Sequence, residues 1–316
     1  MNEEYINELH RLYGKNAEGK IQKIEKGIEK SITEYELDNI KELDNLHYNY
    51  IFSAYSRKYK QDVMVKIILD DTLDSEEIEM LELYNGNNSV KLIAKDKENS
   101  ILVLELVKGE ILAEEQDKEK QVKALCGLID KLVVEKKDGD STLILEYKSL
   151  VKKAIIKNID LNNEKEEYKE QINRLEELKD KIITTLNCLE DKIKERYYLH
   201  GDLHTYNVIK SQNGYLAIDP HGVIGVKSFE YIQYILNEIW NNKEIEEKTD
   251  IKLELEKVIN LIVKYSNEKK EDIEKATIVH AYLTALWFIE DNGSKSAVDK
   301  NIKIIDILLS NYEEII

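Results

Sequence analysis

The segment from 197 to 225, "YYLHGDLHTYNVIKSQNGYLAIDPHGVIG", constrains the fold of this chain more than any other part. It holds three of the six histidines, four of the twelve glycines and the only proline. The residues around it instead repeat apolar side chains every three to four positions, which is typical of amphipathic helices. Because turn formers and polar ligands gather in loops that carry function, the segment predicts an irregular functional loop within a helical region.

The local order of residues predicts how this segment folds. Asn213 and Gly214 form the strongest short hairpin signal, so two short strands are expected on either side of them. Such a hairpin places Asn207 and Asp219 at neighbouring strand ends, where both offer hard oxygen ligands to Mg²⁺. Asp202, on the preceding loop, can accept the proton of an attacking hydroxyl. The alternative is a loop whose Asp and Asn side chains only cap turns.

Two neighbours of Asp202 have expected structural roles. Gly201 allows the backbone conformation that aims the Asp202 side chain, because glycine adopts conformations that other residues avoid. His200 is expected to brace the loop through hydrogen bonds and not to act as a base. The pattern His-x-Asp-Leu-x-x-x-Asn has the spacing of the catalytic loop of protein kinases.

The N-terminal part has a different texture. Residues 1–31 carry apolar side chains at helical spacing, whereas residues 46–107 are rich in aromatic and β-branched side chains. Two antiparallel strands with a polar turn at 57–62, a helix in "DSEEIEMLELY" and two further strands are expected. The sequence therefore predicts a small sheet of four or five strands with one inserted helix.

A lysine in an apolar strand indicates a second part of the site. Lys66 ends the run Val63–Lys66, where an ammonium is costly unless it meets phosphates or a carboxylate. Glu77 shares a helix face with apolar residues and is the expected partner, with Glu79 in reserve. The alternative is an edge-strand lysine that faces solvent.

From about residue 110 onward the pattern is nearly all helical, apart from the quoted segment. The expected division is an N-terminal nucleotide-binding lobe at 1–107 and a helical lobe at 108–316 that holds the catalytic loop and the acceptor site. In this layout the backbone around Glu105 and Val107 hydrogen-bonds adenine. The predicted fold class is α+β.

Charge and composition exclude several classes of function. The 63 acidic residues outnumber the 46 basic ones, for a net charge of −17. This disfavours nucleic acids and anionic membranes as partners and permits cationic ones. No apolar run is long enough for a transmembrane helix, and the acidic start "MNEEYINELH" lacks a signal peptide's features. We therefore expect a cytoplasmic monomer or homodimer.

The motifs resemble a known family. "HGDLHTYNVI" followed by "LAIDPHGVIG" is similar to the aminoglycoside phosphotransferase superfamily, and most similar to its streptomycin/hydroxyurea kinase branch. "EIEMLELYNGNNSVKLI" and "LTALWFIEDNG" also resemble that branch. The resemblance implies a bilobal, protein-kinase-like fold that uses ATP and Mg²⁺. It implies Asp202 as the catalytic base, Asn207 and Asp219 as Mg²⁺ ligands and Lys66 as the phosphate-binding lysine.

The chain departs from the family pattern at three places. "NYIFSAYSRKY", interpreted as the loop that covers the nucleotide, contains no glycine. His221 stands where a lysine is common. The segment "VKSFEY" replaces an acidic pattern and leaves Glu230 near the second acid of that pattern.

The resemblance implies phosphorylation of a small-molecule hydroxyl, with an aminoglycoside such as streptomycin as the named acceptor and antibiotic resistance as the outcome. Candidate ligands for cationic groups of the acceptor are Glu230, Glu238, Glu290 and Asp291, although acids on helices are often only solvated. A kinase of choline, a sugar or another metabolite is the second hypothesis. The third is an inactive kinase-fold binding protein, against which the retention of Lys66, Asp202, Asn207 and Asp219 argues.

Overall fold

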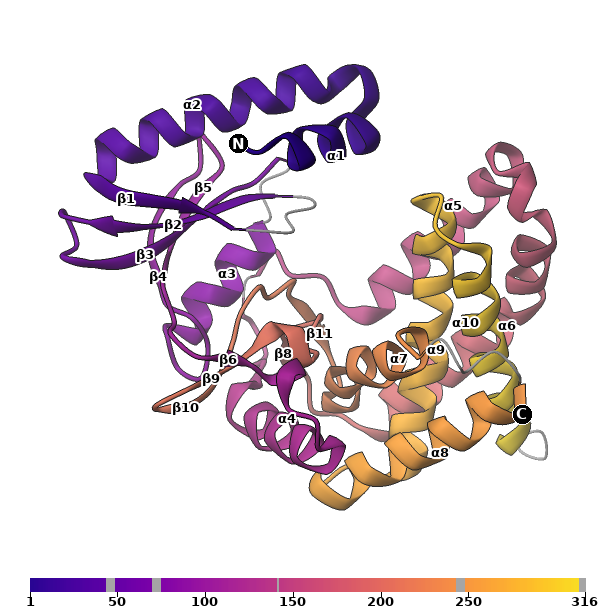
Figure 1. Ribbon diagram of the computed structural model, residues 1–316. Coiled ribbons are helices and arrows are strands. Elements are labelled where there is room, and N and C mark those ends of the chain that lie inside the picture. The colour runs from indigo at the N-terminus through magenta and orange to yellow at the C-terminus, as the bar shows by residue number, and fades with distance from the viewer. Residues whose placement is uncertain (44–48, 70–74, 141, 243–247, 313–316) are drawn as a thin grey trace.

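A computed structural model describes residues 1–43, 49–69, 75–140, 142–242 and 248–312. The chain forms a sheet-containing N-terminal lobe and a larger, mostly helical C-terminal lobe (Figure 1). This arrangement confirms the expected bilobal α+β fold. No helix in the described part of the chain combines the length and the apolar character that crossing a membrane requires.

The N-terminal lobe is a five-stranded antiparallel sheet with three helices. Its strands lie in the order β1-β2-β3-β5-β4. In chain order the elements are α1 (Glu3–Tyr13), α2 (Ala17–Tyr35), β1 (Leu37–Glu42), β2 (Tyr50–Ser56), β3 (Gln61–Ile67), α3 (Ser75–Tyr84), β4 (Leu92–Asp96) and β5 (Ile101–Glu105). Residues 57–60 connect β2 to β3, which confirms the predicted turn. The sequence did not predict β1, because in this edge strand only Leu37 is buried and no apolar alternation results.

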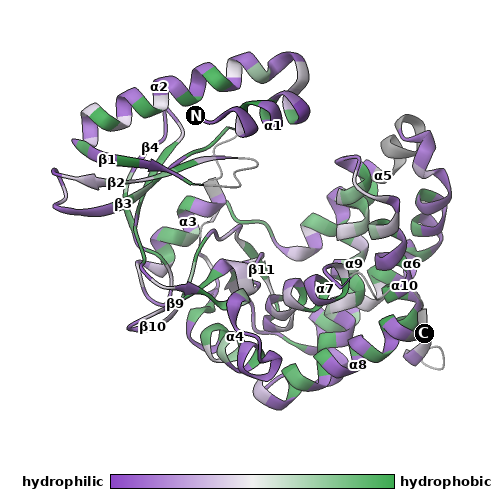
Figure 2. Cartoon of the chain, viewed as in Figure 1, coloured by the Kyte–Doolittle hydropathy of each residue, from purple (hydrophilic) through white to green (hydrophobic). Residues whose placement is uncertain are grey.

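The two faces of this sheet pack against different helices. Val63, Val65 and Ile67 of β3 are fully buried in one cluster with residues of α1 and α2. Because side chains alternate across a strand, Met64 and Lys66 lie on the opposite face, toward α3. Figure 2 shows hydrophilic and hydrophobic residues alternating along α2. Its buried residues, among them Ile24 and Tyr35, recur at helical spacing on one face. The pleat thus directs Lys66 away from the apolar layer under α2 and toward the rest of the molecule.

The C-terminal lobe combines helices with two small sheets. The sheets have the strand orders β10-β9-β6 and β11-β8-β7. The strands are β6 (Glu110–Ile111), β7 (Val134–Glu135), β8 (Tyr197–Leu199), β9 (Val208–Ser211), β10 (Gly214–Ala217) and β11 (Val223–Gly225). The helices are α4 (Lys118–Leu132), α5 (Tyr147–Glu164), α6 (Lys169–Lys192), α7 (Ile232–Trp240), α8 (Lys248–Tyr265), α9 (Lys270–Glu290) and α10 (Lys295–Leu309).

The lobes are joined by the chain connector and by one backbone junction. Just after the connector, β6 pairs with β9 inside the C-terminal lobe, and a Cβ on Gly109 would lie 2.3 Å from the carbonyl oxygen of Lys210, so only glycine fits there. At the junction, the amide of Ala217 donates to Asn88 O and the amide of Val90 donates to Ala217 O, each at 2.9 Å. We propose that the lobes divide at residues 107 and 108, because the chain enters the β6–β9 pairing directly after them.

Candidate active site

The predicted hairpin brings Asn207 and Asp219 together. In β9–β10, Val208 pairs with Ala217, and the amide of Ile218 donates to Asn207 O at 3.0 Å. Asp219 itself has a φ of 60°, a left-handed conformation that is uncommon outside glycine. Such strain persists only where the surrounding structure imposes it, and it gathers at functional sites. The Asp219 carboxylate itself is held by Lys66, whose Nζ lies 2.6 Å from Oδ1.

Asp202 lies on the loop after β8, and its carboxylate has several polar partners. Gln233 Nε2 donates to Oδ1 at 2.6 Å, and Asn207 Nδ2 donates to Oδ2 at 3.1 Å. The Nε2 atoms of His204 and His221 each lie 3.7 Å from Oδ2. Burial alone would raise the pKa of Asp202, but these partners hold the pKa well below its ordinary value. The carboxylate is therefore ionised at neutral pH.

The loop that carries Asp202 is braced from inside the lobe. Gly201 has a φ of 83°, as its predicted role requires. His200 is fully buried, and its Nε2 lies 2.8 Å from Ile218 O, which confirms the expected bracing. Burial lowers the pKa of His200 to about 4, so the ring is neutral.

Glu230 was expected to bind the acceptor, and the structure contradicts this. Its side chain is buried, and its carboxyl accepts from the amides of His200 at 2.9 Å and Gly201 at 3.3 Å. These bonds occupy both carboxyl oxygens with the backbone of the Asp202 loop. Burial raises the pKa of Glu230 to about 7. Glu230 supports the loop and does not face a pocket.

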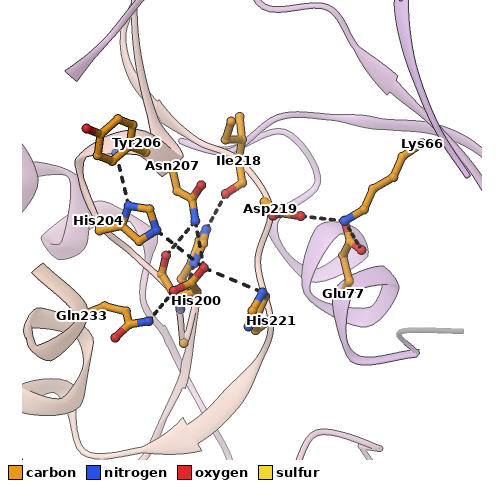
Figure 3. Close-up of polar contacts among 12 residues, drawn as sticks. Lys66, Glu77, His200, His204, Tyr206, Asn207, Ile218, Asp219, His221 and Gln233 are labelled. Carbon is orange, nitrogen blue, oxygen red and sulfur yellow. Dashed lines mark hydrogen bonds and ion pairs between the residues drawn. The ribbon is translucent and has the colours of Figure 1, made fainter. Parts of the chain in front are cut away.

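On the other side of the site, Lys66 contacts two carboxylates. Its Nζ lies 2.8 and 2.9 Å from the Glu77 oxygens and 2.6 Å from Asp219 Oδ1 (Figure 3). Burial alone would lower the pKa of Lys66, but the two carboxylates hold it above its ordinary value. The expected Lys66–Glu77 pair is present. The reserve candidate Glu79 does not take part, because its carboxylate accepts from the Leu143 amide at 3.0 Å.

A cavity of about 180 Å³ lies between the lobes and collects most of the predicted nucleotide residues. Its walls include Lys66, Glu77, Glu105, Val107, Asn207 and Asp219, together with Met64, Val90 and Ile218. A hollow of about 640 Å³ between α4 and the β9–β10 hairpin is larger, but it contains none of the predicted site residues. The smaller cavity is therefore the better candidate for the nucleotide.

The cavity also corrects the prediction of the covering loop. "NYIFSAYSRKY" is β2 and its turn into β3, and the part that reaches the cavity is Ile51, near the start of β2. Leu43, just after β1, lines the cavity as well. Residues 44–48, between Leu43 and Asn49, lie outside the described residues. The sequence from 43 to 49 also contains no glycine.

The oxygen ligands at the hairpin fit a Mg²⁺ ion that takes its other ligands from the phosphates of a nucleotide. Asn207 uses its Nδ2 to bond Asp202, so its carbonyl oxygen stays available as a ligand. Lys66 holds the pKa of the Asp219 carboxyl below its usual range, although burial opposes this. Within the described ranges no group of three or more His, Cys, Asp and Glu could hold a metal alone. Two protein ligands plus phosphates are a usual set for Mg²⁺.

Of the remaining acceptor candidates, two line a cleft and one does not. Glu238 on α7 pairs with Lys118 at 2.8 Å and lines none of the cavities described above. Glu290 and Asp291, at the end of α9, line a cleft of about 460 Å³ between α5 and α9. Lys153 and Lys157 line the same cleft, and Lys157 pairs with Glu290. Asp291 forms no ion pair with any residue that the structure describes.

The aromatic residues near these acids also differ in whether they are exposed to the cleft. Tyr282 is fully buried, and Trp240 packs edge-on against Phe288. Trp287 is 39% exposed and lines the α5–α9 cleft. Its ring also lies edge-on to His280, with centroids 5.7 Å apart. Trp287 is therefore the one of the three that can meet an acceptor.

Sequence reasoning missed three residues that connect to Asp202. Besides Gln233 they are His280, whose Nε2 lies 3.2 Å from Gln233 Oε1, and Tyr147, whose hydroxyl lies 2.8 Å from His280 Nδ1. They come from α7, α9 and α5. A histidine inside the apolar run "TIVHAYLTALW" was the available signal, but such a residue is equally compatible with a plain core position.

Comparisons with known proteins agree with this geometry. The family described as "Aminoglycoside/hydroxyurea antibiotic resistance kinase" matches residues 56–292. A streptomycin 3''-kinase of Klebsiella pneumoniae is 33% identical over 98 residues, which are 29% of this chain and 35% of the relative. The chain thus spans about a third of the length of the curated relative it matches.

Solved structures show the same fold. An aminoglycoside phosphotransferase in a ternary complex with ADP and hygromycin B has a TM-score of 0.61 and 9% identity, covering 89% of this chain and 97% of its own. An ethanolamine kinase of Plasmodium vivax has a TM-score of 0.56 and 14% identity, covering 86% and 82%. At such low identity these structures carry the fold and not the substrate.

Proposed function

This chain belongs to the aminoglycoside/hydroxyurea antibiotic resistance kinase family, and from that premise we propose that it transfers the γ-phosphoryl group of ATP to a hydroxyl of a small molecule. One observation carries the proposal. Asp202, Asn207, Asp219 and the Lys66–Glu77 pair converge from both lobes on one site. A binding protein without chemistry has no need for this convergence.

In the proposed reaction the acceptor oxygen attacks the γ-phosphorus and the bond from this phosphorus to the β,γ-bridging oxygen breaks. The acceptor proton passes to Asp202, and ADP leaves with the electron pair of the broken bond. Lys66 binds phosphate oxygens, and Glu77 keeps its ammonium in place. Asn207 and Asp219 would hold a Mg²⁺ ion, which supplies charge neutralisation at the phosphates. The backbone at Glu105 and Val107 binds adenine.

The low pKa of Asp202 defines its part in this reaction. A carboxylate with a low pKa is a weak base, so it orients the hydroxyl and takes the proton only as the new bond to phosphorus forms. Deprotonation of the acceptor oxygen is then not limited by titration of Asp202 near neutral pH. The rate gain comes from positioning, which is the main source of catalysis in phosphoryl transfer.

We further propose an aminoglycoside of the streptomycin type as the acceptor, placed in the α5–α9 cleft. Family membership and the streptomycin kinase relative support this choice. Trp287 offers a partly exposed ring, and Asp291 offers a carboxylate that forms no ion pair with a described residue. A cationic acceptor group also competes with Lys157 for Glu290.

The test is a transfer assay with γ-labelled ATP or GTP, Mg²⁺ and a panel of streptomycin, hydroxyurea, choline, ethanolamine and simple sugars. We expect label on streptomycin, and labelling about 10²–10⁴-fold slower with the Asp202→Asn variant. Label on choline, ethanolamine or a sugar alone would make the protein a metabolite kinase. No label on any acceptor, together with no thermal shift by Mg-ATP, would contradict the enzymatic proposal and favour an inactive binding protein.

A further inference from the structure

The orientation of one amide controls the environment of Asp202. Gln233 Nε2 lies 2.6 Å from Asp202 Oδ1, with its nitrogen directed toward the centre of the site (Figure 3). Only the nitrogen side of a glutamine amide donates hydrogen bonds. If the amide turned over, its carbonyl oxygen would face the carboxylate and repel it. Something must therefore hold the Gln233 amide in the donating orientation.

His280 provides this restraint if its proton is on Nε2. The Gln233 Oε1 atom must accept, because the nitrogen of the same amide already donates to Asp202. His280 Nε2 is 3.2 Å from this oxygen, so Nε2 carries the hydrogen. A neutral imidazole then has an acceptor at Nδ1. The buried ring is neutral, because burial lowers the pKa of His280 to about 4.

Tyr147 completes the chain by fixing which nitrogen of His280 is protonated. Its hydroxyl lies 2.8 Å from His280 Nδ1 and donates to it. The Tyr147 ring stacks on Phe229, with centroids 3.6 Å apart and an angle of 10° between the planes. Phe229 precedes Glu230, whose carboxyl braces the Asp202 loop. Both ends of the chain are thus anchored around the same loop.

We propose that Tyr147, His280 and Gln233 are positioning residues that hold the Asp202 carboxylate in its reactive orientation. The hydrogen bonds run in one direction, from the Tyr147 hydroxyl to His280, from His280 to Gln233 and from Gln233 to Asp202. His280 and Gln233 each accept one hydrogen bond of this chain and donate the next. If one of these bonds changed its direction, the others would have to change theirs as well. The proposal rests on the proposed function only for its expected effect on kcat. The direction of the chain stands independently of the substrate.

The first experiment reads the chain without any acceptor. The ¹⁵N spectrum of the histidine rings at pH 7 distinguishes an Nε2-protonated ring from an Nδ1-protonated one, and the His280→Gln variant identifies the His280 signals. We expect Nε2 to carry the proton in the unmodified protein. We expect a mixture of the two forms in Tyr147→Phe, because the Nδ1 acceptor then has no donor. An Nδ1-protonated His280 in the unmodified protein would overturn the proposal, whatever the enzyme phosphorylates.

The second experiment measures turnover with the acceptor that the panel identifies. Glutamine at position 280 keeps a donor near the Nε2 position, whereas asparagine is too short to reach Gln233. We expect His280→Asn to lower kcat about 10–100-fold with the KM for ATP unchanged, as for residues that orient a catalytic group. His280→Gln should recover most of the loss. Equal kcat values in the two variants would show that His280 is only structural.

The two experiments also separate this proposal from the proposed function. If the unmodified protein phosphorylates no acceptor, the proposed function fails, and the ¹⁵N spectra still decide the direction of the chain. Melting temperatures of all variants serve as the control for folding. An asparagine variant that melts like the glutamine variant but turns over more slowly supports positioning, and one whose kcat loss is matched by its loss of folded protein contradicts it.

Discussion

The two sides of the site neutralise charge in different ways. On the nucleotide side, the Lys66 ammonium is balanced by full charges on Glu77 and Asp219. On the acceptor side, Asp202 is held by the amides of Asn207 and Gln233 and by two imidazoles (Figure 3). Ion pairs respond to a change of charge, whereas directed hydrogen bonds respond to a change of geometry. The two halves of the proposed reaction thus depend on different physical quantities.

This difference suits the partners of each side. Phosphates bring several negative charges, which Lys66 can meet by exchanging its Asp219 contact for a phosphate oxygen while it keeps Glu77. The acceptor presents one of its hydroxyls to the phosphorus, and the alignment of that hydroxyl decides whether transfer occurs. Variants that change charge or geometry on one side only can test this division.

The largest effect is expected for Asp202→Asn, which keeps the shape of the side chain and removes the base. A positioned base contributes about 10²–10⁴-fold, and we expect a kcat loss in this range. The KM for ATP should change little, because the Asp202 side chain does not contact the nucleotide in the proposed reaction. Asn207 Nδ2 also donates to the backbone oxygen of residue 202 at 2.9 Å, a bond that the variant keeps. Steady-state kinetics with varied ATP provide the measurement. A large rise in the KM for ATP would show that Asp202 also affects nucleotide binding, and it would contradict the separation into two sides.

A smaller loss is expected for Asp219→Asn, which removes charge on the nucleotide side. Residues that merely orient a metal ligand contribute about 10–100-fold, so loss of a charged ligand should lower kcat/KM for Mg-ATP about 100-fold. The concentration of Mg²⁺ needed for half-maximal activity should rise in parallel. An unchanged Mg²⁺ dependence would mean that Asp219 serves Lys66 alone.

Glu230→Gln tests whether the acceptor side contains a titrating acid. Burial raises the pKa of Glu230 from its ordinary value near 4.5 to about 7, so the folded state holds this proton more tightly than the unfolded state. The stabilisation is complete below pH 4.5 and is lost as the pH rises through 7. Between about pH 5 and 7 the free energy of unfolding should fall by about 2 kcal/mol in the unmodified protein relative to the variant.

Denaturant unfolding at several pH values measures this difference. The side-chain carbonyl of the introduced glutamine can still accept one amide hydrogen, so the variant should remain folded. If the free energies of unfolding of the two proteins changed with pH in parallel, the pKa of Glu230 would be the same in the folded and unfolded states. This would contradict the pKa rise expected from its burial.

The smallest effect is expected in the α5–α9 cleft. Replacing Glu290 and Asp291 together by Gln and Asn should raise the KM for streptomycin about tenfold, or roughly 1.4 kcal/mol. The KM for ATP should not change. Glu238→Gln is the control, because it removes an acid that pairs with Lys118 and does not line the cleft. If the control raises the acceptor KM as much as the double variant, the effect is one of overall charge.

The sequence predicted those parts of the site whose residues belong to neighbouring strands and helices along the chain. Asn207 and Asp219 meet because one tight turn joins their strands, and Lys66 meets Glu77 because a strand and the next helix each have one polar position on the facing side. These placements need only the periods of a strand and a helix. The bilobal α+β fold follows from the same patterns and from the resemblance.

The parts that were missed depend on the packing of distant helices. Tyr147 and His280 are 133 residues apart, and Gln233 and His280 are 47 apart, so no local pattern relates them. Glu230 was assigned to the acceptor because its charge is visible in the sequence and its burial is not. The strand β1 was missed for the opposite reason, because it is mostly exposed and carries no apolar period.

The junction at Ala217 has a consequence for how the enzyme opens. Asn88 and Val90 bind Ala217 through the backbone, and Asp219 lies only two residues beyond it. A rotation of one lobe against the other displaces each atom in proportion to its distance from the axis. We propose that this junction is the pivot of such a rotation, so that Asn207 and Asp219 stay assembled while the parts of the N-terminal lobe far from Ala217 move most.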